Sequence, residues 1–520
     1  MPDRLSLATL GRLPRAARPV LDPRAISVGI VHLGLGAFCR AHQAVYTETA
    51  AELTGELHWG ICGTSQRSAR MASTLAEQDG LYSVLVPGPG ASGSNRPASE
   101  PPGWGTTATP AGAGSLRVIA SLRQALFAQA DPAGLTARIA GRAVEIVTLT
   151  VTEKGYRHNL ATRQLTSGDP ELAADAAGRP PRTVIGQLAR GFEARRRAHG
   201  EPLTVISCDN IPANGRLLEG LVQQFLAWPG GVFDHGLADW VAERVCFPST
   251  MVDRIVPAST ERWLEDVAER LGLRDEGAVV TEPFSQWVIE DRFAARRPAW
   301  ERAGAQVVVE VAPYEALKLR ALNGAHSALA HLGLLAGCQY IDEAMSLPGF
   351  EGFVRYLLDS EVRPTLDLPG EVDFKAYAEA VLTRFANPAL PYTCLQVTSD
   401  GSQKLPQRVL GVVRDRLKAG YVPHAAVLVV AAWLRAIWTG RDDRGRPFDL
   451  ADPLAGPLRE ALAGTQDPAR VVEHALQLHQ VFGPDLAGDE RFTAALTEAL
   501  VDLTRQGAQR VVGVGGAFSR

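Results

Sequence analysis

One helical pattern carries the densest group of polar side chains in the sequence, formed by Glu315, Lys318, Asn323 and His326. At about 100° per residue the first, second and fourth of these share one stripe of a helix, and Asn323 lies on its flank. A lysine amine that is taken out of water loses its charge more readily and can accept a hydroxyl proton. Asparagine is a neutral donor for an alkoxide or carbonyl oxygen, and histidine can orient a hydroxyl. The same spacing also suits a surface Glu–Lys pair beside a core histidine, and spacing alone favours that second interpretation.

A second candidate site is the glycine turn Gly34-Leu-Gly36, which follows an apolar run and precedes a helix-compatible stretch at 37–53. In a dinucleotide-binding fold the first glycine permits the tight turn, and the second lets the backbone approach a pyrophosphate at a helix start. Cys39 occupies the usual third glycine position, and a lone G-x-G also suits a simple tight turn. The alternation of strands and helices around the turn favours cofactor binding.

The segment after the second predicted strand bears on which dinucleotide is bound. An acidic residue there would accept the ribose hydroxyls of NAD. The run from Gly63 to Arg70 has no acidic residue and carries Arg67 and Arg70. These arginines could meet a 2′-phosphate or could be ordinary solvated residues, so the choice between NAD and NADP stays open.

Polar residues also follow two other predicted strands. Thr152-Glu-Lys-Gly-Tyr156 follows the strand at 144–151, and Ser207-Cys-Asp-Asn210 follows the strand at 203–207. Both would lie at the carboxyl edge of a parallel sheet, where ligands usually bind. Asp253-Arg254 and the run from Asp400 to Lys404 are more typical of turns or ion pairs. No histidine forms an H-x-H or H-E-x-x-H pattern, so we expect no metal site.

The elements that must position these residues indicate an α/β fold followed by a helical domain. Short apolar runs at 25–33, 58–62, 82–86, 118–120, 144–151 and 203–207 alternate with helical patterns, which predicts a parallel sheet covered on both faces. After about residue 300, helices are predicted at 314–335, 348–358, 368–385, 405–419, 424–438, 454–462 and 468–478, the last with Asp467 as its N-cap. We therefore predict domains at 1–300 and 301–520, with the boundary near 298–306. The Pro-, Gly- and Ser-rich run at 87–115 is expected to be a flexible insertion in the first domain.

Composition excludes several classes of protein. The chain of 520 residues has 53 basic and 57 acidic side chains, a net charge of -4, so neither nucleic acid nor an anionic membrane is an expected partner. Six cysteines without a C-x-x-C pair indicate a reducing compartment. The longest apolar run, at 425–434, is too short to span a membrane. The Arg-rich N-terminus has no apolar core, which argues against a secretory signal and leaves an organellar presequence as an alternative to the predicted cytoplasmic location.

Together these motifs resemble those of the polyol-specific long-chain dehydrogenases, the mannitol dehydrogenase family. The matching runs lie at 31–43, 149–156, 207–210, 247–254, 282–290, 318–326 and 400–408. The resemblance covers about residues 25–510, except the run at 87–115. It implies a metal-independent NAD(P) dehydrogenase, often monomeric, with a Rossmann-like N-terminal domain and a helical C-terminal domain. Its substrate would be a small sugar alcohol or hexuronate.

The resemblance also implies residue roles. Lys318 would be the general base, Asn210 and Asn323 would hold the developing oxyanion, His326 would orient the substrate hydroxyl, and Glu315 would lie on the proton's route to solvent. The residues that the resemblance assigns to the cofactor are Gly34, Gly36, Phe38, Arg40, Thr152 and Glu153. Those that it assigns to the substrate are Asp253, Lys404 and Arg408.

One departure bears on the substrate. Mannitol 2-dehydrogenases are expected to have an arginine eight residues before Lys404, where this chain has Gln396. The runs at 400–408, 247–257 and 286–291 instead resemble those of D-mannonate oxidoreductases (fructuronate reductases). We therefore expect D-mannonate and D-fructuronate first, mannitol and fructose second, and a phosphorylated mannitol third, with NAD as cofactor and NADP open. The cation for a hexuronate carboxylate would be Lys404, Arg408 or Arg40. A non-catalytic nucleotide sensor is a more remote alternative, because a sensor needs no proton acceptor.

Overall fold

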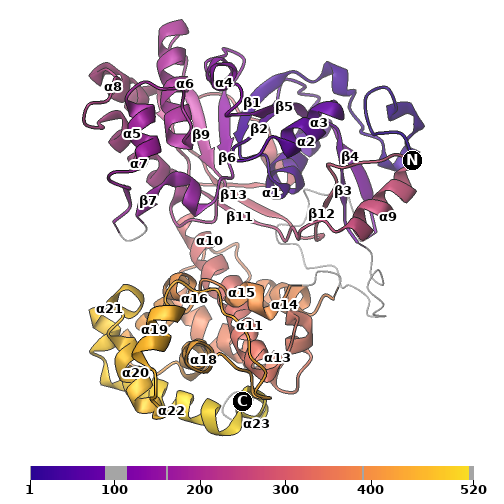
Figure 1. The fold of residues 1–520 in the computed structure, drawn as a ribbon. Helices are drawn as coiled ribbons and strands as arrows, with labels where there is room; N and C mark the ends of the chain where they lie inside the picture. The colour runs from indigo at the N-terminus through magenta and orange to yellow at the C-terminus, as the bar shows by residue number, and fades with distance from the viewer. Residues whose placement is uncertain (1, 88–113, 160–161, 389–391, 515–520) are drawn as a thin grey trace. The chain divides into compact units, whose positions relative to one another are not determined.

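The computed structural model describes residues 2–87, 114–159, 162–388 and 392–514 (Figure 1). The described chain divides into two units, of which the first ends at Ala312 and the second begins at Pro313. The boundary was predicted at 298–306, a few residues before this division. The last strand of the first unit, β14 (Gln306–Val308), still pairs with β13 (Gln286–Glu290), so the chain leaves this unit only after it.

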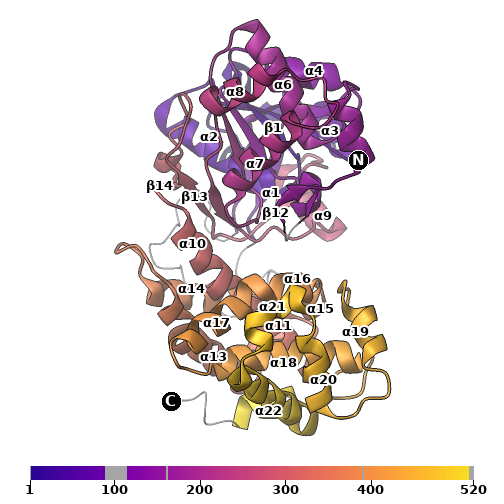
Figure 2. The ribbon, with the colours of Figure 1, turned by 90° about the vertical axis from the view of Figure 1, so that its left-hand side faces the viewer.

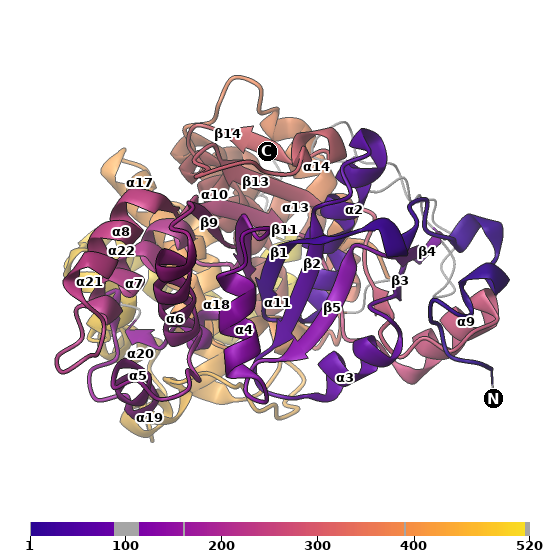
Figure 3. The same cartoon turned by 90° about the horizontal axis from the view of Figure 1, so that it is seen from above.

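A six-stranded parallel sheet organises the N-terminal unit, with the order β10-β9-β6-β1-β2-β5. Figure 3 labels β9, β1, β2 and β5 of this sheet. All of its neighbouring strands pair in parallel. The strands are β10 (Val245–Cys246), β9 (Leu203–Ser207), β6 (Ile146–Leu149), β1 (Val28–Leu33), β2 (Gly60–Ser65) and β5 (Leu122–Phe127). The predicted α/β class is confirmed.

Alternate residues of the strands face two different cores. Val31 and Leu33 of β1 pack in a core with one group of helices, and Ile30 packs in a second core on the opposite face. The first group is α4 (Pro132–Ile139), α6 (Val184–Ala198), α7 (Asn214–Leu226) and α8 (His235–Arg244). The opposite face is covered by α2 (Gln43–Thr54) and by a sheet of β11 (Thr250–Asp253), β13 and β14.

Two predicted strands do not join the central sheet. β3 (Tyr82–Leu85) and β4 (Leu116–Ile119) pair antiparallel with each other and, with β12 (Val279–Val280), form a small sheet that packs on α9 (Glu261–Leu271). The sequence reading missed β5, which enters the central sheet just after β4. The buried carboxylate of Glu48 accepts hydrogen bonds from the N–H groups of Ala120 (2.5 Å) and Ser121 (2.7 Å), which fixes the bend between the two strands. Most of the predicted flexible insertion, residues 88–113, lies outside the described residues.

The helix predicted at 37–53 is broken at His42, whose φ and ψ are -123° and -86°. It forms α1 (Ala37–Ala41) and α2. The remaining elements of the unit are α3 (Arg70–Glu77), α5 (Pro170–Ala176), β7 (His158–Asn159), β8 (Gln164–Leu165) and short 3₁₀ turns that include η4 (Glu153–Tyr156).

The C-terminal unit is helical, as predicted (Figure 2). Its helices α11 (Gly324–Ala336) and α18 (His424–Thr439) are buried along nearly their whole length. Asp467 caps α20 (Pro468–Leu476), as predicted, by accepting the N–H of Ala469. The other helices are α10 (Ala312–Leu317), α12 (Ile341–Met345), α13 (Phe350–Tyr356), α14 (Phe374–Phe385), α15 (Cys394–Thr398), α16 (Gly401–Leu405), α17 (Gly411–Lys418), α19 (Ala455–Ala461), α20 (Pro468–Leu476), α21 (His479–Ala487), α22 (Glu490–Gln506) and α23 (Ala508–Val514). Three π-helical segments interrupt them: η6 (Lys318–Asn323), η7 (Leu357–Val362) and η9 (Pro406–Leu410). Within the described residues, no helix has the length and apolar character that crossing a bilayer requires.

Candidate active site

The glycine turn at the end of β1 has two glycines with different reasons to be glycine. Gly34 has φ of 105°, and a Cβ there would lie 2.0 Å from the carbonyl oxygen of Thr150. The positive φ and the nearby carbonyl oxygen therefore both require glycine at position 34. A Cβ on Gly36 would meet only the carbonyl oxygen of Gly34, at 3.7 Å. The chain itself leaves room at Gly36, which fits the close approach of a dinucleotide pyrophosphate.

The loops after β6 and β9 meet at the side chain of Asp209. This carboxylate accepts the N–H groups of Val151 (3.1 Å) and Thr152 (2.8 Å) and the hydroxyl of Tyr156 (2.6 Å). Burial raises the pKa of Asp209 above its usual value, although the three donors act in the opposite direction. Asn210, the next residue, is exposed. The structure thus brings both predicted polar loops to one edge of the sheet.

Thr152 and Glu153 lie at that edge with exposed side chains. Thr152 has φ of 67° and ψ of 162°, and Glu153 opens the 3₁₀ turn η4. Both therefore lie on the carboxyl side of β6.

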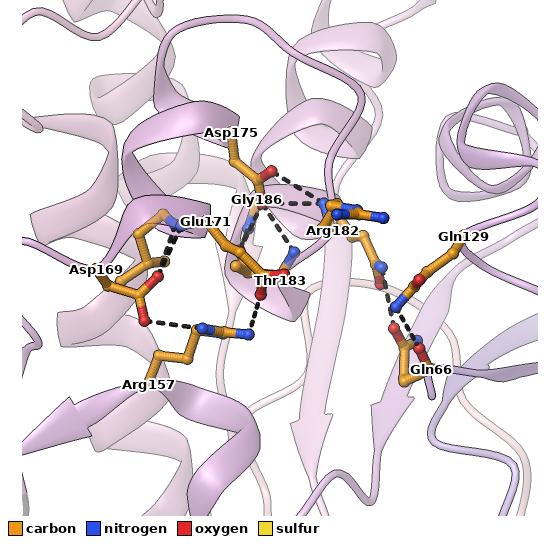
Figure 4. A network of polar contacts seen from close by, with 11 residues as sticks. Gln66, Gln129, Arg157, Asp169, Glu171, Asp175, Arg182, Thr183 and Gly186 are labelled. Carbon is orange, nitrogen blue, oxygen red and sulfur yellow. Dashed lines mark hydrogen bonds and ion pairs between the residues drawn. The ribbon is translucent and has the colours of Figure 1, made fainter. Parts of the chain in front are cut away.

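The segment after β2, which would meet the cofactor ribose, is anchored through Gln66. The Oε1 of Gln66 accepts a hydrogen bond from Gln187 of α6 (2.9 Å), and its carbonyl oxygen accepts one from Gln129 (2.9 Å), as Figure 4 shows in part. Arg67 and Arg70 are exposed. The contacts of Gln66 fix the segment in place without an acidic side chain.

Arg40 is held inside the N-terminal unit. It is only 5% exposed, and its guanidinium donates to the carbonyl oxygens of Gly36 (3.2 Å) and Gly277. Burial lowers the pKa of Arg40. Arg40 therefore supports the glycine turn, which is a correction to its candidacy as a substrate cation. Phe38, another predicted cofactor residue, stacks on His42 with ring centroids 4.9 Å apart.

Asp253 is the last residue of β11 and is 6% exposed. The adjacent Arg254 donates to the carbonyl oxygens of Glu282 (3.0 Å) and Ala41, and burial lowers the pKa of Arg254 to about 10. These hydrogen bonds connect the sheet of β11, β13 and β14 to the last residue of α1. The pair is therefore a buried strand end and not the surface turn that its sequence also suggested.

In the C-terminal unit, Lys318 opens the π-helical segment η6, and Asn323 closes it. Lys318 is 3% exposed, while Glu315, one turn earlier, is partly exposed. In a π-helix, residues five apart stack as residues four apart do in an α-helix. The widened turn therefore brings Asn323 toward the face of Lys318, whereas regular helical spacing placed it on the flank. A 3.6-residue period cannot reveal this change.

His326 lies one turn further along, in α11, and is flanked by two aromatic rings. It stacks on Phe385 with centroids 5.1 Å apart and meets the edge of Tyr392 at 5.8 Å. The sequence reading missed both aromatic residues, because no local pattern links them to the helix.

The segment η9, which carries Arg408, packs against this helix. Pro406 has no N–H group for the regular helical bond, which accounts for the π turn there. A Cβ on Gly324 would lie 2.9 Å from the carbonyl oxygen of Arg408, so this glycine permits the close approach. The guanidinium of Arg408 donates to the hydroxyl of Ser327 (3.2 Å).

Lys404 lies one turn before Arg408 and donates to the carbonyl oxygens of Ser399 (2.6 Å) and Val397 (3.4 Å). Burial lowers the pKa of His331 in α11 to about 3, and the charges of Lys404 and Arg408 act in the same direction. Both cations therefore lie near α11, the helix of His326.

The predicted residues thus form two groups. The N-terminal unit holds Gly34, Gly36, Phe38, Arg40, Thr152, Glu153, Asn210 and Asp253, and the C-terminal unit holds Glu315, Lys318, Asn323, His326, Lys404 and Arg408. In the described part of the chain, no three His, Cys, Asp or Glu side chains gather as a metal site would require. The first group offers a dinucleotide-binding edge, and the second offers a buried amine, an amide, an imidazole and two cations.

Two family models match the chain. The mannitol dehydrogenase Rossmann domain matches residues 106–302, and the mannitol dehydrogenase C-terminal domain matches residues 310–504. The two models together span most of both units.

Full-length relatives agree with these matches. The uncharacterized oxidoreductase YdfI of Escherichia coli (strain K12) is 39% identical over 509 residues, which cover 96% of this chain and 97% of the relative. The D-mannonate oxidoreductase of the same strain is 37% identical over 505 residues, covering 95% and 97%. The solved structure of Pseudomonas fluorescens mannitol 2-dehydrogenase, a ternary complex with NAD and D-mannitol, is 31% identical, with a TM-score of 0.82 and 98% of each chain covered. The chain therefore belongs to the mannitol dehydrogenase family.

Proposed function

We propose that this chain is an NAD-dependent oxidoreductase that interconverts a secondary alcohol of a six-carbon polyol or aldonate with its ketone, and that its substrates are D-mannonate and D-fructuronate. NAD as cofactor is supported by the room at Gly36 and by the NAD complex of the Pseudomonas relative. The cofactor supplies the hydride acceptor, and the protein supplies the proton acceptor and the oxygen ligands.

Lys318 takes the proton of the substrate hydroxyl as the alcohol is oxidised. Its burial supports this role, since an amine shielded from water gives up its charge more readily. Asn323 and Asn210 donate hydrogen bonds to the oxygen on which negative charge develops. His326, fixed by its aromatic neighbours, orients the substrate hydroxyl, and Glu315 passes the proton toward solvent. No metal has a role in this scheme.

The choice of a hexuronate rests on Arg408. Its guanidinium donates to the hydroxyl of Ser327, one residue after His326 in α11, which supports a cation near the proposed substrate site. A planar guanidinium is suited to bind a carboxylate through two hydrogen bonds. Arg40 is no longer a candidate for this contact because it is only 5% exposed and its guanidinium is held by backbone carbonyls. Lys404 is partly exposed and remains a second cation near the same helix. Mannitol is the rival substrate, because the Pseudomonas relative binds it.

A substrate panel tests the proposal. Oxidation of NADH is measured with D-fructuronate, D-fructose and D-fructose 6-phosphate, and the first is expected to give the highest kcat/KM. A higher kcat/KM with fructose would make the chain a mannitol 2-dehydrogenase. Absence of NADH oxidation with all three would contradict an oxidoreductase of this substrate class.

The Arg408→Ala variant separates carboxylate binding from the rest of catalysis. We expect it to lower kcat/KM for fructuronate at least about tenfold more than for fructose, since loss of a charge-assisted pair costs about 1.5–3 kcal/mol. An equal loss for both ketoses would contradict a carboxylate contact at Arg408.

A further inference from the structure

Asp209 is a buried carboxylate to which the proposed chemistry gives no role. It is 8% exposed and accepts three hydrogen bonds, from the N–H groups of Val151 and Thr152 and from the hydroxyl of Tyr156. Tyr156 also pairs with the hydroxyl of Ser207 (2.7 Å). The side chain of Asp209, which follows β9, therefore fastens the loop that follows β6.

The residue that Asp209 holds has a strained backbone. Thr152, with φ of 67° and ψ of 162°, lies in a region that is essentially restricted to glycine. A β-branched residue stays in such a conformation only where its surroundings enforce it. The 2.8 Å bond from the Thr152 N–H to Asp209 is a contact that does so.

The other end of the loop is also anchored. Arg157, at the end of the η4 turn, forms ion pairs with Asp169 (2.8 Å) and Glu171 at the start of α5 (Figure 4). The N–H of Gly155 donates to the carbonyl oxygen of Thr152 (2.9 Å). Residues 152–157, which we call the Thr152 turn, are thus held at both ends at the carboxyl edge of the central sheet.

We propose that Asp209 is a positioning residue that holds the Thr152 turn in the conformation that binds the cofactor. A carboxylate suits the position because all three of its partners are donors, and an ionised carboxylate is acceptor-only. Strain of this kind gathers at ligand sites, where it preorganises the backbone. The proposal rests on NAD binding as given under the proposed function.

The Asp209→Asn variant tests this role. Its amide NH₂ would face at least one backbone N–H, of Thr152 at one oxygen position or of Val151 at the other, so the turn would relax. We expect the Kd for NAD, measured by fluorescence titration, to rise at least about tenfold, while kcat at saturating NAD falls by less than about threefold. Should this variant fail to fold, Tyr156→Phe removes one donor only, and we expect its Kd to rise about threefold.

Asp175 provides a matched control within the same unit. It is 1% exposed and, like Asp209, accepts two backbone N–H groups, of Arg182 (2.9 Å) and Thr183 (2.8 Å), and one hydroxyl, of Thr183 (2.7 Å) (Figure 4). Asp175→Asn and Asp209→Asn are both expected to lower the apparent Tm, but Asp175→Asn should leave the Kd for NAD unchanged. Equal effects of both variants on the Kd would overturn the inference.

A rescue experiment separates strain from general damage. Glycine adopts the backbone angles of Thr152 without steric cost, so Asp209→Asn combined with Thr152→Gly should regain at least about threefold in NAD affinity over Asp209→Asn alone. No recovery, or wild-type affinity in Asp209→Asn, would overturn the inference while leaving the proposed function intact. Wild-type protein that binds no NAD would contradict the proposed function itself.

Discussion

At the scale of single residues, Lys318 is the side chain with the greatest chemical consequence. It is 3% exposed at the first position of a π-helical segment, and burying an amine is costly. We expect Lys318→Ala to lower kcat by about 10²–10⁴, the range for loss of a general base, with the Kd for NAD unchanged. Steady-state rates and fluorescence titration measure the two quantities.

The exposed Lys418 at the end of α17 serves as the control for that variant. Lys418→Ala removes the same side chain away from the proposed site, and we expect wild-type turnover. A loss of less than tenfold in Lys318→Ala would show that another group accepts the proton.

The two glycines of the turn after β1 give a second prediction. Gly34→Ala places a Cβ 2.0 Å from a backbone oxygen at φ of 105°, so we expect a lower apparent Tm and little folded protein. Gly36→Ala meets no such obstacle at 3.7 Å. We expect Gly36→Ala to keep the wild-type Tm while the KM for NAD rises at least about tenfold, because the methyl group would occupy the room for the pyrophosphate. An unchanged KM in Gly36→Ala would place the cofactor elsewhere.

At the scale of elements, η7 and α18 are joined by a buried charge. Glu361 of η7 is 4% exposed and accepts the N–H groups of Ala425 (2.9 Å) and Ala426 (2.8 Å) in the first turn of α18. Burial raises the pKa of Glu361 to about 7 from 4.5, although these donors and the charge of Arg416 oppose the shift. The folded protein therefore binds a proton at this site over a range of pH in which the unfolded chain has already released it.

The sign of the effect on stability follows from proton linkage. Between these two pKa values the folded state holds more protons than the unfolded state, so this group makes the protein less stable as pH rises. The change is on the order of 3 kcal/mol in the free energy of unfolding. Glu361→Gln has no titrating group at this position. We therefore expect the apparent Tm of the variant minus that of the wild type to increase from about pH 5 to about pH 8. A difference in Tm that does not vary with pH would contradict the raised pKa.

The π-helical segments also belong to this scale. η6 and η9 meet where Gly324 lets the carbonyl oxygen of Arg408 approach the next helix. Each π-helical segment rotates the residues that follow it about the helix axis, as one inserted residue does in an α-helix. Such π-bulges are frequent at functional sites. This is why Asn323, on the flank of the predicted stripe, belongs with Lys318.

At the scale of the whole molecule, the cofactor and substrate residues are divided between the two units. We expect NAD to slow amide hydrogen exchange at 28–37, 146–157 and 203–210 in the N-terminal unit, with no change in α18 and α22. D-Mannonate, added with NAD, should then slow exchange at 318–326 and 404–408. If NAD alone slowed exchange at 318–326 and 404–408 and left 28–37, 146–157 and 203–210 unchanged, the assignment of residues to cofactor and substrate would be contradicted.

The elements differ in how well the sequence alone predicts them. β9 was predicted with its observed bounds, and α18 within one residue, because each is a continuous apolar run whose ends are visible in the sequence. β5 was missed and β3 was assigned to the wrong sheet, because pairing depends on Glu48, a residue distant in the sequence, fixing the bend between β4 and β5.

The sequence by itself determined the α/β class and the helical second unit, and it named Lys318, Asn323 and His326 as candidate catalytic residues, since periodicity and residue type act over a few neighbouring residues. Only the tertiary structure removed Arg40 from the candidate cations, placed Phe385 and Tyr392 around His326, turned Asn323 toward Lys318 and brought three donors to Asp209. These outcomes depend on burial and on hydrogen bonds between residues far apart in the chain. The cost of leaving a buried polar group unpaired acts on the folded molecule and not on any local stretch of sequence.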